Sequence, residues 1–137
     1  MPVAVPRKTI ELFSRAKDPK QAILSAVGNL SSVELMFNTV LVAIYIRPET
    51  TSGGIIRPGS NVIEDLWQSK AGLVLKLGPD AFVDDGVNHF NGQKVEIGDW
   101  CAFRIGDTWQ LSLNDVACRL VEDTHIKLKL SDPSVVF

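Results

Sequence analysis

Short apolar segments separated by turn-forming residues recur throughout the second half of the chain, and their spacing constrains the fold more than any other feature. Turn formers stand at residues 98–99, 104–107 and 114–115, so strand-like segments follow one another about every 8 to 12 residues. Residues 108–113 alternate apolar with polar side chains, as a strand with one dry face does. This spacing predicts a mainly β domain, and more narrowly a small antiparallel β-barrel.

Two longer strands are predicted before this series. Residues 36–46 are rich in β-branched and aromatic side chains, and the unbroken apolar character of their second half indicates a strand covered on both faces. Residues 71–77 form another apolar segment, which ends at a Gly-Pro turn signal. The polar, turn-rich residues 79–94 predict a hairpin excursion. We therefore expect the barrel to occupy residues 35–130.

Residues 1–34 differ from the barrel and predict an N-terminal arm with one helix over about 19–27. Asp18 is suited to cap the free amides of the first turn, a proline follows at the first helical position, and Gly28 is a natural C-terminal stop. Two alternatives stay open for this helix: a lid packed on the barrel, or an arm that binds another subunit or an assembly. Residues 131–137 form a C-terminal tail.

Residues 47–69 are expected to form an exposed loop, and its first part, residues 47–60, holds two adjacent isoleucines that a polar loop cannot bury locally. Paired glycines before them give backbone freedom, so the isoleucines call for a partner surface on this protein or on another. Trp67 is expected to anchor the return of the loop, either on a neighbouring subunit or on the external partner. The candidate partner-binding residues are Gly53, Gly54, Ile55, Ile56, Arg57, Pro58 and Trp67.

Charge and hydropathy bear on the class of partner. The chain of 137 residues has 14 Lys and Arg against 16 Asp and Glu, a formal charge of −2, so no overall attraction to nucleic acid or to an anionic membrane is expected. The longest apolar run, residues 40–46, is much shorter than the roughly 20 residues of a bilayer span. No secretory signal is recognisable and two cysteines are too few for a disulfide framework, so a cytoplasmic location is the simplest expectation.

No catalytic, cofactor or metal motif is recognisable, so we expect a non-enzymatic protein without a cofactor. The sequence has no Gly-x-Ser-x-Gly, no His-Glu-x-x-His and no phosphate-binding loop. Cys101, Cys118 and His125 lack the close spacing of metal ligands and are expected to be core or strand residues. Trp100 and Trp109 are expected in the core or at a subunit interface.

Four segments, taken in order, resemble the GroES-like co-chaperonin family over about two thirds of the chain. Residues 38–42 stand in the place of the family's Asp-Arg-Val-Leu-Val strand, with Asn-Thr in place of Asp-Arg. Residues 49–58 resemble the family's mobile loop, and residues 72–78 resemble its Gly-x-Val-x-Ala-Val-Gly strand. Residues 95–103 resemble its Val-x-x-Gly-Asp-x-Val-x-Phe hairpin.

The resemblance implies a β-barrel subunit that assembles into a ring, with a loop that docks on the apical domains of a chaperonin and caps its folding chamber. Ile55 and Ile56 match the first two apolar positions of the tripeptide that docks in the family. Arg57 stands at the third position. An unpaired guanidinium is costly to bury, so this residue is expected to keep its charge in water or to find a partner.

The N-terminal helix and the C-terminal tail resemble those of GroES-like proteins encoded by tailed bacteriophages. Two functions are compatible with this resemblance, and both predict a homo-oligomer. The first is a co-chaperonin-like protein in the host cytoplasm that assists the folding of other proteins, such as phage capsid protein. The alternative is a virion structural protein, a cement or decoration protein on the capsid surface that binds the major capsid protein.

Overall fold

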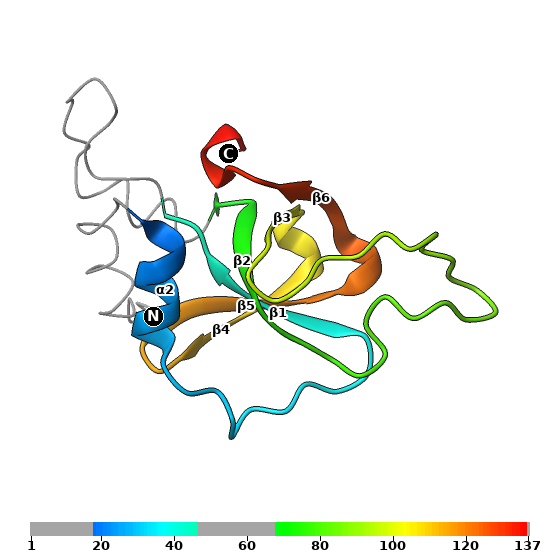
Figure 1. The fold of residues 1–137 in the computed structure, drawn as a ribbon, viewed down its shortest axis with the longest axis horizontal. Helices are drawn as coiled ribbons and strands as arrows, with labels where there is room; N and C mark the ends of the chain where they lie inside the picture. Colours follow the sequence, from blue (N-terminus) through cyan, green and yellow to red (C-terminus); the bar gives the residue numbers. More distant parts are fainter. Residues whose placement is uncertain (1–17, 47–67, 137) are drawn as a thin grey trace.

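A computed structural model describes residues 18–46 and 68–136, and these residues form a mainly β structure, as the sequence predicts (Figure 1). Six antiparallel strands make one sheet with the order β4-β5-β1-β2-β3-β6. The strands are β1 (Thr39–Ile44), β2 (Ala71–Leu77), β3 (Trp100–Phe103), β4 (Thr108–Leu113), β5 (Val116–Glu122) and β6 (Ile126–Leu130). The described helical elements are the α-helix α2 (Pro19–Val27) and the 3-10 turns η1 (Ile105–Asp107), η2 (Asp123–His125) and η3 (Pro133–Val135).

The sheet is barrel-like but not a closed barrel. Strands β4 and β6 stand at the two ends of the strand order, and within residues 18–46 and 68–136 no backbone pairing joins them. Strand spacing in a sequence indicates how many strands follow one another, but it does not report whether the last two edges meet. The antiparallel β architecture is therefore confirmed, and the closed barrel is corrected to an open sheet with two edge strands.

The central strand β1 begins later than predicted because the chain turns before it. Phe37 has a φ of 57°, which no extended strand adopts, and both Met36 and Phe37 are exposed. From Val40 to Ile44 every side chain is buried, so the predicted cover on both faces of this strand is confirmed. The strand lies between β2 and β5, in the middle of the sheet.

The segment between β2 and β3, residues 78–99, contains no strand, so the hairpin predicted over residues 79–94 is wrong in form. We call this segment the excursion. Side chains bind its backbone amides: Asp85 Oδ1 accepts from the N–H groups of Val87 and Asn88 at 2.7 and 2.6 Å. Such side-chain acceptors compete with strand pairing, which explains why a run of turn formers gives an irregular loop here.

The turn predicted at Gly98 and Asp99 is present, although residues 95–97 before it do not form the short strand that the hairpin motif suggested. Gly98 has a φ of 95°, a conformation suited to glycine, and its N–H donates to the carbonyl of Val74 at 2.8 Å. The N–H of Val74 in turn donates to the carbonyl of Asp99 at 2.8 Å. These two bonds tie the end of the excursion to β2.

Helix α2 occupies the predicted range, with the predicted signals at both ends. Asp18 Oδ1 accepts from the N–H of Gln21 at 3.2 Å, and Pro19 stands in the first turn. Gly28 ends the helix with a φ of 67°, and its N–H donates to the carbonyl of Leu24 at 3.3 Å. Local sequence signals are thus sufficient to set both ends of this helix.

Helix α2 packs on its own sheet, as the lid alternative predicts. Ile23 and Val27 are 3% and 2% exposed and belong to the core. Asn114, in the turn between β4 and β5, adds a hydrogen bond from its side-chain amide to the carbonyl of Val27 at 2.6 Å. Leu24 is 36% exposed and lies at the margin of this contact. The apolar face of the helix is therefore largely used within the chain.

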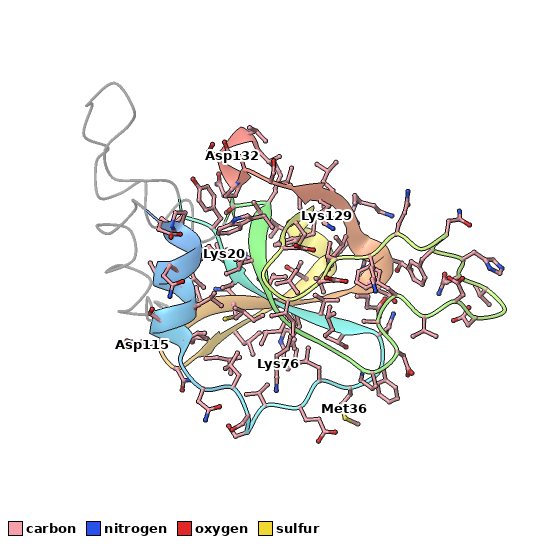
Figure 2. The ribbon with its side chains drawn as sticks, viewed as in Figure 1. Lys20, Met36, Lys76, Asp115, Lys129 and Asp132 are labelled. Atoms are coloured by element: carbon pink, nitrogen blue, oxygen red, sulfur yellow. The ribbon has the colours of Figure 1, made fainter. Side chains whose placement is uncertain are left out.

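Residues 28–38 connect α2 to β1, and we call them the strap. Lys76 on β2 fixes the strap to the sheet, because its ammonium donates to the carbonyl of Leu30 at 2.8 Å and also to the carbonyl of Val33 (Figure 2). The strap ends at Met36, on the side of the molecule opposite the C-terminal turn in the same view. It therefore brings polar residues near the start of β4.

The buried side chains form two clusters on the two faces of the sheet. On the face covered by α2 and the strap, the helix face, the cluster includes Ile23, Val27, Leu41, Ala43, Tyr45, Leu73, Leu75, Trp100, Val116 and Cys118. On the other face, the excursion face, it includes Val40, Val42, Ile44, Val74, Val95, Cys101, Phe103, Ala117 and Val121, with Phe82 of the excursion packed against it. In the part of the chain that the structure describes, no helix is long and apolar enough to cross a bilayer.

Candidate functional site

The candidate partner-binding residues Gly53, Gly54, Ile55, Ile56, Arg57, Pro58 and Trp67 lie outside the described residues. The structure instead describes the two points from which residues 47–67 leave and return, the end of β1 and the start of β2. These strands are neighbours in the middle of the sheet, so both roots of the segment lie side by side. The roots decide how force or order at the loop reaches the rest of the molecule.

Backbone pairing continues to the roots on both sides. Ile44 lies opposite Gly72, and beyond it the N–H of Tyr45 donates to the carbonyl of Ala71 at 3.0 Å. On the returning side, the carbonyl of Lys70 accepts from the N–H of Phe103 on β3 at 3.0 Å. Three strands thus hold the two ends of residues 47–67 in fixed positions, as a rigid scaffold does for a binding loop.

The side chains at the roots are buried. Tyr45 and Ile46 are 3% and 8% exposed, and the Tyr45 ring meets the Trp100 ring edge-on with centroids 5.5 Å apart. Ser69, 1% exposed, donates its hydroxyl to the carbonyl of Ala71 at 3.3 Å. A partner bound to residues 47–67 therefore acts on the buried centre of the sheet, and not on a loose edge.

The two cysteines are core residues on opposite faces of the sheet. Burial raises the pKa of both the Cys101 and the Cys118 thiol to about 12, and the carboxylate of Asp99 adds to the effect at Cys101. Such thiols are protonated at neutral pH and are poor nucleophiles and metal ligands. His125 lies in η2, not in a strand. Across residues 18–46 and 68–136, no three His, Cys, Asp or Glu side chains are gathered to hold a metal ion.

The two strand tryptophans have different environments. Trp100 on β3 is 7% exposed and belongs to the helix-face core. Trp109 on β4 is 68% exposed, so the core alternative is wrong for this residue and the interface alternative stays a prediction. The alternating pattern of β4 places Trp109 on the same face as the core, but β4 is an edge strand and α2 does not reach this end of it.

Asp123 is a buried polar centre that the sequence analysis missed. Its Oδ1 accepts from the side-chain amide of Asn38 at 2.9 Å and from its neighbour Thr124, while Oδ2 accepts from the N–H of Phe82 at 2.9 Å. The carboxylate thereby joins the start of β1, the excursion and η2. The available signal was one aspartate among several turn formers, which does not distinguish Asp123 from the exposed Asp80.

Arg119 is a second buried polar residue that was not singled out. It is 3% exposed on β5, and its Nη1 donates to the hydroxyl of Thr108 at 2.9 Å. Burial lowers the pKa of the guanidinium from its ordinary value. Because Thr108 is the first residue of β4, this bond fixes the start of that edge strand beyond the backbone pairing.

Two surface grooves lie on either side of η2, and the sequence predicted neither. The basic groove, of about 710 Å³, runs between β6 and the excursion and is lined by Phe82, Phe90, Lys94, Lys127, Leu128 and Lys129, among others. The acidic groove, of about 690 Å³, lies between the strap and the β4–β5 pair and is lined by Glu34, Met36, Asp107, Trp109, Leu120 and Glu122, among others.

Comparison with known proteins assigns no relative: the sequence matches no model of a known protein family and no curated protein.

Proposed function

We propose that the chain is a non-enzymatic, co-chaperonin-like subunit that forms a ring and binds a chaperonin through residues 47–60 to assist protein folding, with phage capsid protein as the client. The proposal rests on the ordered resemblance to the GroES-like family. In that reading, Ile55 and Ile56 are the residues that dock on the chaperonin's apical domains.

The observation that supports this proposal best is the pair of roots of residues 47–67. A docking loop must transmit a pull to a rigid body, and these roots are buried, hydrogen-bonded and placed on neighbouring central strands. Open edges at β4 and β6 give a further, weaker support, because unpaired strands are available for contact with another copy. Both features are as expected for a subunit that hangs a loop from the rim of an assembly.

A weak contact at each loop is compatible with useful binding in a ring. Arg57 replaces an aliphatic group and keeps its charge near water, so a single loop is expected to bind less well than one with three aliphatic residues. Several loops presented together bind with a gain of about 10²- to 10⁴-fold over one, provided that the spacing allows simultaneous contact. The proposal therefore depends on assembly as much as on the isoleucines.

The test is retention of the purified chain on an immobilised bacterial chaperonin in the presence of ATP. The double variant Ile55→Asp with Ile56→Asp is expected to lose at least about tenfold in affinity, because a carboxylate cannot enter an apolar groove without a partner. Ile97→Asp is the matched control, since Ile97 is 61% exposed and lies in the excursion. Equal retention of the parent and the double variant would refute the proposal.

The alternative is a cement or decoration protein on the capsid, and the observation in its favour is the elaboration outside the barrel-like sheet. Helix α2 is docked on the helix face, and η3 ends the described chain with Pro133 buried and Val135 exposed. In this reading the outer side of α2 and residues 47–67 contact the major capsid protein. Mass spectrometry of purified particles decides it, because a cement protein must be present in stoichiometric amounts.

A further inference from the structure

The two grooves beside η2 carry opposite charge. The basic groove is lined by three lysines and His89, and the one acidic residue in its lining, Asp123, has its oxygens engaged by three donors. Lys94 and Lys129 each have an exposed carboxylate nearby, Glu96 at 3.5 Å and Asp99 at 3.4 Å, and such surface pairs are weak. The groove therefore stays available to a negatively charged partner.

The acidic groove has the complementary lining. Glu34, Asp107 and Glu122 line it, and among the described residues no lysine or arginine does. A hydrogen bond from Arg104 at 2.8 Å lowers the pKa of Asp107 and holds it ionised. Glu34 and Glu122 are exposed. One chain thus presents an acidic hollow and a basic hollow of nearly equal size.

Each groove also has a projecting apolar rim on an edge strand. Trp109 on β4, 68% exposed, stands at the rim of the acidic groove. Leu128 on β6, 50% exposed, stands at the rim of the basic groove between Lys127 and Lys129. In the described chain the outer backbone edge of each strand has no strand partner. Exposed aromatic residues next to apolar hollows are typical anchors of protein interfaces.

We propose that a second copy of this chain occupies these grooves, unlike groove against unlike groove. Trp109 of one copy enters the basic groove of the next, where Phe82, Phe90 and the lysines surround it. The β6 rim of that copy, with Leu128 between two lysines, enters the acidic groove of the first. The contact deepens the proposed function and rests on it only for the purpose of assembly, since it involves no residue of the loop.

Charge complementarity selects a second copy over other occupants. Nucleic acid would satisfy the basic groove but would be repelled by the acidic groove on the other side of η2. A copy of the same chain satisfies both grooves at once, and it places a lysine ammonium near the face of an indole ring. Figure 2 shows Met36 of the acidic groove and Lys129 of the basic groove well apart, so one copy can contact two neighbours.

The first test is a charge swap followed by sedimentation equilibrium over a dilution series. Lys127→Glu and Glu122→Lys are each expected to weaken self-association at least about tenfold, and the chain that carries both changes is expected to recover it. Lys20→Glu on α2, outside both grooves, is the matched control and is expected to leave the mass unchanged. Failure of the combined variant to recover, with an unchanged thermal unfolding curve, overturns the proposal.

The second test removes the aromatic anchor. Trp109→Ala is expected to raise the dissociation constant about 30-fold or more, whereas Val135→Ala, 71% exposed and outside both grooves, leaves it unchanged. A parent chain that keeps single-copy mass at about 1 mM overturns the proposal, as does a Lys127-dependent complex with a labelled oligonucleotide. The Ile55→Asp, Ile56→Asp variant is expected to assemble normally, so loss of chaperonin binding and loss of this contact are distinguished.

Discussion

The helix face and the excursion face of the same sheet are covered in different ways. On the helix face, a capped helix presents two buried aliphatic side chains and needs few polar contacts with the sheet. On the excursion face, an irregular segment without strands packs Phe82 and Val95 on the core, and side chains bind several of its backbone amides. A regular element satisfies its own backbone, whereas an irregular one must borrow acceptors.

This difference concentrates the stability of the excursion face in a few polar atoms. Asp123 binds Asn38 and Phe82, which lie on the two segments that meet at the edge of the excursion. Loss of an apolar contact leaves a cavity, but loss of this carboxylate leaves buried donors without an acceptor. The two faces should therefore respond differently to single substitutions and to pH.

The largest effect is expected from Asp123→Ala. It removes the acceptor of the Asn38 amide and of the Phe82 N–H, and we expect a loss of about 4 kcal/mol in the free energy of unfolding. Urea unfolding followed by circular dichroism measures it. Asp80→Ala, at an exposed position of the same excursion, should change the value by less than about 0.5 kcal/mol. Similar losses for the two variants would show that Asp123 does not hold the excursion.

The next effect is expected from Ile23→Ala on the helix face. Ile23 is 3% exposed, and its truncation is expected to cost about 3 kcal/mol through lost burial and the cavity that remains. Leu24→Ala, next to it but 36% exposed, is the control and should cost about 1 kcal/mol or less. If both variants lose the same stability, the helix does not pack through Ile23, and the lid reading of α2 is wrong.

Alkaline pH tests both faces through their buried thiols. The pKa of each thiol rises from an ordinary value of 9.0 to about 12, so only the unfolded chain ionises above pH 9. Stability is therefore fully present below pH 9 and falls as pH rises toward 12. Between pH 8 and pH 10 we expect a loss of about 1.4 kcal/mol for each thiol, on a slope of about 1.36 kcal/mol per unit.

Single-alanine variants assign the alkaline loss to a face. Cys101→Ala should remove the share of the excursion face, and Cys118→Ala should remove the share of the helix face. Chemical unfolding at pH 8 and pH 10 gives the difference for each variant. An unchanged pH dependence in the double variant would assign the loss to other groups.

The smallest effect is expected from the cap of α2. Asp18→Ala removes the acceptor of the Gln21 N–H at the exposed start of the helix, and the expected loss is about 1 kcal/mol. Asp18→Ser, which can cap in the same way, should restore most of it. A thermal melt with a precision of about 1 °C resolves the difference. No recovery with serine would mean that the aspartate acts through its charge.

Local signals in the sequence were enough for the regular elements. The Asp-Pro start and the glycine stop gave α2, and apolar runs bounded by turn formers gave β2 and β6. The ordered motifs also placed the roots of residues 47–67 on neighbouring strands. These features depend on residues close together in the chain, which is where propensity and periodicity are informative.

Features that depend on distant residues were not predictable. Asp123 is important because Asn38 and Phe82 approach it from elsewhere in the chain, and nothing beside it in the sequence indicates this. Trp109 alternates as a core residue does, but its strand lies at an edge where no described element covers it. The two grooves arise between segments far apart in sequence, so neither their shape nor their charge is visible in any one stretch.

The pairing of β1 with β5 determines when this sheet can be completed. Thr39 lies opposite Glu122, so the most apolar strand must wait for a partner made near the end of synthesis. At about 5 to 20 residues per second, β1 stays without that neighbour for about 4 to 17 s on the ribosome. The chain therefore exposes its own aggregation-prone strand during translation, and it depends on fast closure by β2, or on protection by another protein, until β5 emerges.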